Sequence, residues 1–237
     1  MDYLPNIFFA IALVVGIGFF VMNILKLIRN IKLGKDIDRS DRKIERWKNM
    51  ARIALGQSKM VSRPFAGFLH IIVYIGFVVI NIEVLEIVID GLFGTHRVFQ
   101  PLLGNTIYGF LIGTFEILAF LVLVAVILFW LRRNIIQLKR FMSKEMKGWP
   151  KSDGNLILYF EIVLMALFII MNATDVEFQS SNNGNIISQF FAPIFEGFNV
   201  NLIERIAWWM HIVGIIIFLN YLYYSKHLHI LLAFPNT

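Results

Sequence analysis

The last apolar run of the chain carries two histidines, His211 and His229, whose spacing suits metal ligation on both sides of a membrane. They are 18 residues apart, and the run between them is strongly apolar. On an α-helix this separation is five turns, so both imidazoles share one face and lie about 27 Å apart along the axis. A bilayer's hydrocarbon core is about 30 Å thick. If the helix continues until Pro235 stops it, the pair predicts one haem ligand near each membrane surface.

A third histidine, His70, is expected to complete an inner haem site. It lies six residues into another apolar run, which starts at Pro64. Antiparallel packing of the two runs would bring His70 and His229 to a similar depth, which predicts a bis-histidine pair for one haem b. The alternative is a hydrogen-bonded structural histidine, although ionisable groups inside a membrane are costly and commonly functional. His227, two residues before His229, is expected to face away as an interfacial histidine.

An outer haem at His211 needs a second ligand, and the only candidate is His96. No further histidine follows His70 in its own run, whereas His96 stands just beyond the end of that run. If the loop around His96 folds back into the membrane, its imidazole can reach His211; otherwise it is an ordinary loop histidine. One haem b is therefore predicted, and a second depends on His96. The cations placed to pair with haem propionates are Arg205 at the outer end and Arg63 and Lys226 at the inner end.

Three carboxylates stand in the outer half of the second apolar run. Glu83, Glu86 and Asp90 are spaced by three and four residues, so they share broadly one helix face. Oxidation of a quinol near the outer surface needs a proton acceptor and an exit to that side, and this face could supply both. The alternatives are that Asp90 is interfacial and Glu86 pairs with Arg97, or that the three acids serve a small proton or ion transporter.

The composition is that of a membrane protein. Of the 237 residues, 58% are hydrophobic and 16% are charged, whereas a soluble domain has about 25% charged residues. The chain has no cysteine, which excludes disulfides, cysteine-ligated iron–sulfur clusters and c-type haem attachment within these residues. Histidine and methionine remain as ligands for a transition metal.

Five segments are long and apolar enough to cross a bilayer as helices of roughly 20 residues. The sequence therefore predicts an all-α bundle of five transmembrane helices that forms one domain over residues 1–237, without the internal repeat of many transporters. The first segment lacks the basic leader and cleavage site of a signal peptide, so we expect it to be retained. The predicted spans are residues 4–27, 64–89, 106–131, 156–174 and 203–224.

Basic residues predict the orientation of the bundle. Twelve of the 22 Lys and Arg residues lie in residues 26–63 and seven in residues 132–151, and Lys226 follows the last span. Only Arg97 and Arg205 remain for the other side. The positive-inside rule then places the N-terminus outside, and loops 28–63 and 132–155 and the C-terminus in the cytoplasm. The net charge of +6 thus marks topology and not nucleic-acid binding. Trp208 and Trp209 are expected in the outer aromatic belt.

The two longest connections differ in character. Residues 37–60 mix acids and bases in a pattern that favours an amphipathic helix, either on the membrane surface or as a docking face for a partner. A solvated loop that only fixes topology explains the same charges. The outer connection, residues 175–201, predicts a flexible Asn/Ser/Gly-rich turn followed by a short interfacial helix.

These histidines resemble those of a known family, the five-span cytochrome b subunit (gamma subunit) of respiratory nitrate reductase. The resemblance is carried by residues 67–70 (GFLH), His211, His229 and the ending KHLHIL at 226–231. That family has two histidines on the second span and two on the fifth. His70, His211 and His229 match three of them, whereas the fourth position, near Ile80, is apolar. The resemblance thus implies the inner haem by residue, and the outer haem only if His96 replaces the missing ligand.

A closer resemblance, over essentially the whole chain, is to the membrane region of iron–sulfur oxidoreductases related to heterodisulfide reductase. It is carried by residues 34–39 (GKDIDR), 54–60 (ALGQSKM) and 221–236 (YLYYSKHLHILLAFPN). It implies a location in a bacterial inner membrane and electron exchange between menaquinone and a cytoplasmic iron–sulfur protein of the heterodisulfide reductase type. Because the sequence ends at Thr237 and lacks cysteine, we expect the clusters on another subunit or on a portion absent here.

The sequence therefore favours a haem b subunit of a quinone-dependent oxidoreductase, embedded among membrane lipids. Whether it counts as an enzyme by itself is left open, because the predicted role is electron transfer between a quinone and a separate redox partner. Two rival hypotheses remain: a non-redox anchor that tethers a cytoplasmic complex through its basic loops, and a small transporter that uses Glu83, Glu86 and Asp90. Haem content separates the first hypothesis from both rivals.

Overall fold

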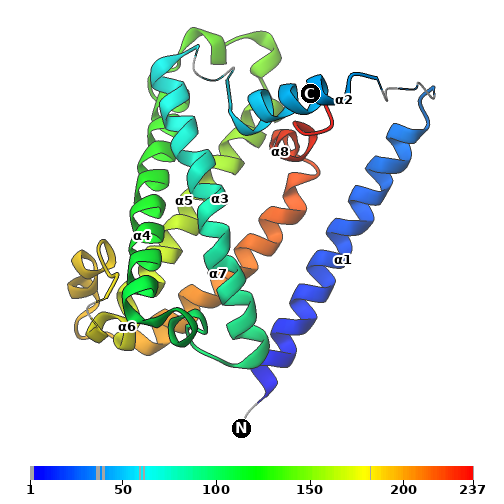
Figure 1. Ribbon diagram of the computed structural model, residues 1–237. Coiled ribbons are helices and arrows are strands. Elements are labelled where there is room, and N and C mark those ends of the chain that lie inside the picture. The colour runs from blue at the N-terminus through cyan, green and yellow to red at the C-terminus, as the bar shows by residue number, and fades with distance from the viewer. Residues whose placement is uncertain are drawn as a thin grey trace.

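The computed structural model describes residues 3–35, 38, 41–58, 60, 62–181 and 183–236 as a bundle of five long helices (Figure 1). All five are long and apolar enough to cross a membrane, and the described residues include no β-strand. This confirms the predicted all-α architecture, although each of the five helices extends beyond its predicted span at one end or both, and α7 also ends two residues earlier than predicted. The long helices are α1 (Leu4–Lys32), α3 (Pro64–Phe93), α4 (Phe99–Asn134), α5 (Trp149–Thr174) and α7 (Val200–Leu222).

Short helical segments form the connections at both ends of the bundle. At the end with the basic connections, which is predicted to face the cytoplasm and is here named the inner end, they are α2 (Lys43–Met50), a π-helical turn (Ala51–Leu55), 3₁₀ turns (Lys139–Phe141, Lys144–Met146 and Lys226–Leu228) and α8 (His229–Leu232). The amphipathic helix predicted over residues 37–60 is thus shorter, and Ile37, Arg39, Ser40 and Lys59 lie outside the described residues. At the outer end they are α6 (Val176–Ser181) and two 3₁₀ turns (Ser188–Phe190 and Ala192–Phe195), in place of the predicted turn and single interfacial helix. Asn182 of that predicted turn is not among the described residues.

The long helices are arranged in a ring. Helix α7 packs on α5, α5 on α4 and α4 on α3, while α1 contacts both α3 and α7. Helices α3 and α7 run in opposite directions, as predicted, but have little direct contact with each other (Figure 1). The core between them contains Ile112, Phe115, Phe168 and Ile212, all almost fully buried. The two helices that carry the histidines therefore face each other across the bundle.

Local chemistry explains where α3 begins and ends. Pro64 stands in the first turn, where the missing N–H is not needed for a helical hydrogen bond. The helix ends at Gly94, which has a φ of 68° and donates its backbone N–H to the carbonyl of Asp90 at 2.8 Å. A left-handed residue after the last turn is the usual place for glycine. A tight connection to α4 follows.

Helix α7 ends at Leu222, so the predicted continuous helix from His211 to Pro235 is wrong. The Ser225 hydroxyl accepts a hydrogen bond from the backbone N–H of His227 at 3.1 Å, which starts a separate 3₁₀ turn. Buried Asp153 of α5 accepts from the Tyr221 hydroxyl at 2.6 Å and from the backbone N–H of Lys226 at 3.0 Å. These contacts turn the chain away from the α7 axis, so His211 and His229 do not share one helix face.

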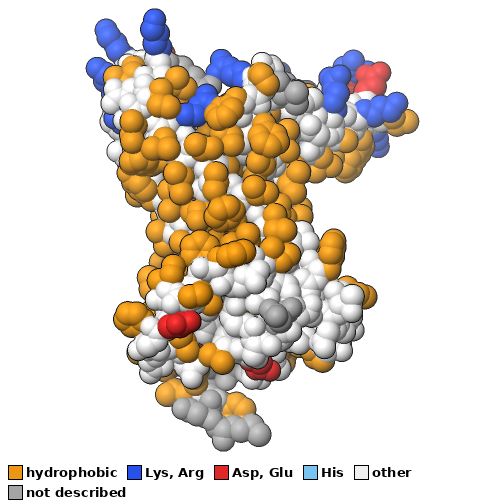
Figure 2. All heavy atoms as spheres, turned by 90° about the vertical axis from the view of Figure 1, so that its left-hand side faces the viewer, with side chains coloured by type: hydrophobic (Ala, Val, Ile, Leu, Met, Phe, Trp, Pro, Cys, Tyr) orange, Lys and Arg blue, Asp and Glu red, His pale blue; other side chains and the backbone are white. Residues whose placement is uncertain are grey.

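Charge and apolar surface are segregated along the bundle. Figure 2 shows Lys and Arg side chains gathered at one end, beside a broad belt of hydrophobic side chains. That end carries the two basic connections that follow α1 and α4. Applied to this distribution, the positive-inside rule predicts that the basic end faces the cytoplasm.

Helix α1 contacts α3 at a glycine, which generates a test of the packing. A Cβ atom on Gly91 would lie 2.6 Å from the ring of Phe9, closer than real contacts allow. We expect Gly91→Ala to destabilise the bundle by about 1–3 kcal/mol, as overpacking commonly does. Gly18→Ala is the matched control, because nothing lies within 4 Å of the added Cβ. Thermal denaturation in detergent measures both variants, and an equal effect of the two would contradict the described contact.

Candidate functional site

Three histidines gather at the inner end of the bundle. His70 of α3 is partly buried, its Nδ1 has no hydrogen-bond partner among the described residues, and it lies close enough to His229 for their charges to interact. His229 places its Nδ1 2.8 Å from the carbonyl of Lys226. Because a carbonyl can only accept, Nδ1 donates and Nε2 is left as a bare acceptor. The rings of His227 and His229 are stacked, with centroids 5.7 Å apart and 16° between planes.

His227 belongs to this cluster, contrary to the prediction that it faces away. Its ring meets Phe218 edge-on at 5.6 Å, and its buried Nδ1 has no partner in the described part of the chain. Burial lowers the pKa of His227 to about 4, with a smaller contribution from His229. Its Nε2 lies 3.7 Å from Glu161 Oε1, but a neutral imidazole at pH 7 makes this no ion pair. The prediction failed because it assumed one continuous helix through this segment.

His211 is buried in the middle of the bundle, with 1% of its surface exposed. Its Nδ1 lies 3.0 Å from the carbonyl of Leu164 and therefore donates to it, while its Nε2 is buried with no partner that the structure describes. Phe168 lies beside the ring at 6.0 Å. A histidine fixed through Nδ1–H presents a bare Nε2, the form that binds a metal or accepts a hydrogen bond.

His96 lies far from this imidazole, at the outer end. Its Nε2 is 3.0 Å from Asp175 Oδ2 and its Nδ1 is 3.4 Å from Glu177 Oε2. Both ring nitrogens thus face carboxylates, and His96 does not line the cavity that His211 lines. The structure therefore does not make the predicted pair of His96 and His211.

The residues fit an inner haem better than an outer one. At the inner end, His70 and His227 each have a buried Nδ1 without a partner among the described residues, and the hydrogen bond of His229 Nδ1 leaves its Nε2 as an acceptor. At His211, no second imidazole is present among the described residues that line the cavity. In the whole described part of the chain, no group of three or more His, Asp or Glu residues could hold a metal ion. A two-histidine haem site does not require such a group.

The three cations proposed for propionates have different surroundings. Arg205 pairs with Glu204 and lies over the Trp208 ring at 5.5 Å. Lys226 Nζ donates to the carbonyl of Pro150 at 3.3 Å. Arg63 is exposed immediately before α3, about two turns from His70. Lys226 is the inner cation nearest the histidine cluster, because it is adjacent to His227 and its carbonyl accepts from His229 Nδ1.

Two of the three outer acids hold the turn between α3 and α4. Glu86 accepts from the backbone N–H of Phe99 at 2.8 Å and from the Tyr108 hydroxyl at 3.0 Å. Asp90 accepts from the backbone N–H of Arg97 at 2.7 Å, from that of Val98 at 3.2 Å, and from a nearby threonine hydroxyl. Backbone donors that would otherwise be unpaired are satisfied in this way. These contacts give both acids a structural role.

Arg97 is the centre of a buried network that the sequence did not reveal. Its guanidinium donates to Asp175 at 2.9 Å, to the Tyr108 hydroxyl at 3.3 Å and to Asn172 Oδ1 at 3.1 Å, and it lies over the Phe178 ring at 4.0 Å. The predicted pairing of Glu86 with Arg97 therefore runs through Tyr108. The one signal in the sequence was an arginine on the side of the bundle that is otherwise poor in basic residues.

Glu83 differs from its neighbours. It is 3% exposed, and its Oε2 has no hydrogen-bond partner among the residues described. It lines a cavity of about 30 Å³ together with Arg97, Met171 and Trp208. A water molecule needs roughly 10–15 Å³ of such space, so the cavity can hold water beside the carboxyl group. Of the three acids, Glu83 is thus the one whose carboxyl group is available to exchange a proton with water in the cavity.

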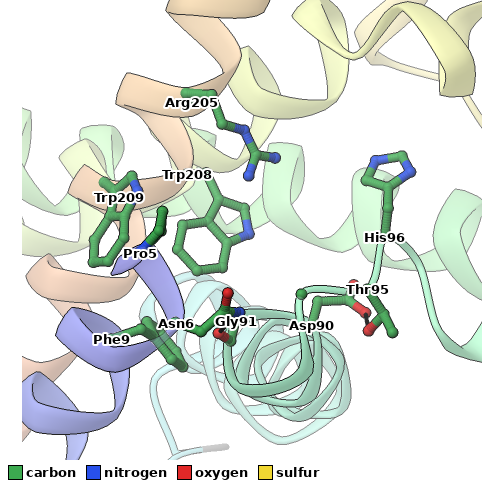
Figure 3. A pocket seen from close by; sticks show the side chains of 11 residues that line it. Pro5, Asn6, Phe9, Asp90, Gly91, Thr95, His96, Arg205, Trp208 and Trp209 are labelled. Atoms are coloured by element: carbon green, nitrogen blue, oxygen red, sulfur yellow. Dashed lines mark hydrogen bonds between the residues drawn. The ribbon is translucent and has the colours of Figure 1, made fainter. Parts of the chain in front are cut away.

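A second cavity, of about 160 Å³, continues from Glu83 toward the outer surface (Figure 3). Asp90, His96, Arg205 and Trp208 line both cavities, which therefore adjoin. Figure 3 shows Arg205 and His96 on one side of Trp208 and the aromatic residues of α1 and α7 on the other. The two cavities form a polar path from a buried carboxyl to the outer end.

The tryptophans face the protein more than the predicted lipid belt. Trp208 is only 9% exposed, and its ring centroid lies 5.3 Å from that of Phe9. Trp209 contacts the same Phe9 ring at 6.0 Å. These contacts fix the outer part of α1 against α7.

Comparisons with known proteins give two relatives. The chain is 26% identical over 235 residues to the probable iron-sulfur-binding oxidoreductase FadF of Bacillus subtilis, covering 97% of this chain and 32% of that protein. It is 22% identical over 242 residues to the EtfAB:quinone oxidoreductase of Syntrophomonas wolfei, covering 95% of this chain and 32% of that protein. The relationship is to iron–sulfur oxidoreductases in the broad sense. The chain spans about a third of the length of these relatives. No family model and no solved structure matches it.

The outer pair of His96 and Asp175 predicts a pH-dependent stability. The hydrogen bond with Asp175 raises the pKa of His96, although burial opposes the shift. A raised pKa in the folded state stabilises the fold fully below the unfolded value of about 6.5, and this stabilisation is lost as pH rises through the folded value. We expect His96→Gln to lower the Tm by about 2–4 °C at pH 5.5, since a half-exposed pair contributes about 1 kcal/mol or less.

At pH 9 the same substitution should leave the Tm nearly unchanged. Thermal unfolding of both proteins in the same detergent at the two pH values measures the difference. An equal loss at pH 5.5 and pH 9 would show that the imidazole acts only by packing.

Proposed function

We propose that the chain is the membrane electron-transfer part of a quinone-dependent iron–sulfur oxidoreductase. It would exchange electrons between menaquinone, or another quinone, and a cytoplasmic iron–sulfur protein of the heterodisulfide reductase type. The observation that carries this proposal is the set of imidazole nitrogens without partners, on His70, His211 and His227, inside a bundle of membrane-spanning length. The names of the two relatives agree with it, because one is called iron-sulfur-binding and the other a quinone oxidoreductase.

We assign haem b to the inner histidine cluster, where His70 and His229 would hold it. The haem supplies one-electron transfer when it is bound. The hydrogen bond from His229 Nδ1 to the Lys226 carbonyl fixes the ring and leaves Nε2 as the ligand atom. Lys226 supplies positive charge near this site. The inner position suits a redox partner that docks at the basic end of the bundle (Figure 2).

We assign proton transfer on the outer side to Glu83. A quinol that loses electrons must also lose protons, and Glu83 is the acid with an unpartnered oxygen beside a water-sized cavity. The adjoining cavity then leads the proton past Asp90 and His96 to the outside. Glu86 and Asp90 act by holding the turn that forms the path. In a non-redox anchor, neither the unpartnered imidazoles nor this path would be needed.

Haem content gives the first test of this proposal. The purified full chain should show a b-type reduced-minus-oxidised spectrum, which His70→Ala and His229→Ala abolish because each removes an axial ligand. His96→Ala is the control and should keep the spectrum, since both of its nitrogens face carboxylates. Absence of haem from well-folded protein, made in cells able to synthesise haem, would leave an anchor or a transporter.

The role of Glu83 predicts a kinetic effect without loss of haem. Glu83→Gln should slow electron transfer from a short-chain quinol to the bound haem by about 10²-fold, because a positioned proton acceptor contributes about that much or more. Glu196→Gln, in an exposed outer turn, is the matched control. Stopped-flow spectroscopy measures both rates, and an unchanged rate in Glu83→Gln would refute this assignment.

A further inference from the structure

A cavity of about 100 Å³ lies beside His211, between α3, α5 and α7. Its walls are mainly apolar, and three polar side chains line it: His211, Glu161 and Asn81. Asn81 and Phe77 are also exposed on the outer surface of α3. Because Phe77 and Asn81 both line the cavity and are exposed, the cavity reaches the surface of α3 within the apolar part of the bundle.

The residues around this cavity do not fit the outer haem that the resemblance to the nitrate reductase subunit implies. A second axial ligand would stand near Ile80, but that side chain is apolar, 5% exposed and part of the wall. At Gly76, on the same wall, even an added Cβ would collide with Val122 of α4. One imidazole therefore faces a narrow apolar space with no opposing ligand among the described residues.

We propose that this cavity binds the ring of a quinol, with a ring hydroxyl donating to His211 Nε2. This inference rests on the proposed function and adds where the substrate binds. His211 Nδ1 donates to the Leu164 carbonyl at 3.0 Å, so the neutral ring carries its proton on Nδ1. Its Nε2 can therefore only accept a hydrogen bond. A hydroquinone offers an O–H donor, whereas the oxidised quinone offers only carbonyl acceptors. The site is thus matched to the reduced ligand.

The size and shape of the cavity agree with a single ring entering from the lipid. An apolar protein cavity of about 150 Å³ admits benzene, and the 100 Å³ here is of the same order and is open on one side. The isoprenoid tail of a quinol would then remain between α3 and α7, beside exposed Phe77. Glu161, at the inner part of the same wall, is placed to bind the second ring hydroxyl.

The cavity also lies next to the proton path. Val84 lines the quinol cavity, while the adjacent Glu83 lines the polar cavity of about 30 Å³. On α7, His211 is about one turn from Trp208, which lines that polar cavity. A quinol at His211 would thus sit between the inner histidines and the outer path.

The test measures binding of a short-chain naphthoquinol, kept reduced under anaerobic conditions, to the haem-loaded full chain in detergent. Isothermal titration should show that His211→Leu weakens binding at least tenfold, and that the wild type binds the quinol more tightly than the quinone. Glu161→Gln serves as a second variant if His211→Leu does not fold, and should weaken binding severalfold. Glu196→Gln is the control, because Glu196 is exposed in an outer turn and does not line this cavity.

Each outcome decides the proposal. Weakened quinol binding with an intact b-type spectrum supports it. Loss of haem from His211→Leu would make His211 a haem ligand and overturn it, as would unchanged binding in both variants or no binding to the wild type. If the wild type holds no haem, the proposed electron-transfer function fails, while the binding difference between wild type and variants still reports on the cavity.

Discussion

Inside a membrane bundle every buried polar group needs a partner, because no water is available to replace a missing hydrogen bond. The outer end of this protein meets that constraint around Arg97, whose guanidinium is bound by Asp175, Tyr108 and Asn172 and thereby joins α3, α4 and α5. Against this background the exceptions stand out. The Nε2 of His211 and the Oε2 of Glu83 are buried without a partner in the described structure, and each faces a cavity.

The architecture could be predicted from the sequence because hydrophobic length alone requires helices in a bilayer, and five runs have that length. The helix end at Leu222 could not, because it depends on Asp153, 73 residues away in the sequence, which binds the backbone of Lys226. His227 was misplaced for the same reason. Two residues 18 positions apart, such as His211 and His229, share a helix face only if the helix is continuous between them.

The candidate site was predicted in part. The hydropathy pattern indicated that Glu83, Glu86 and Asp90 lie in one outer segment, but their roles differ because of the turn that follows α3. Backbone N–H groups of that turn donate hydrogen bonds to Glu86 and Asp90 but not to Glu83. The location of those donors is a tertiary feature. Arg97 and its partners, from three elements, were missed for the same physical reason.

We propose that electron transfer occurs at the inner histidines, that the quinol binds beside His211 in the middle of the bundle, and that protons are released at the outer end. Its central claim is that a haem held by His70 and His229 exchanges electrons with a membrane quinone. The most direct measurement is to mix the oxidised, haem-loaded protein anaerobically with a short-chain naphthoquinol. The account predicts that the reduced b-type signal appears within the mixing experiment. A haem-loaded, folded protein whose signal stays oxidised would contradict it.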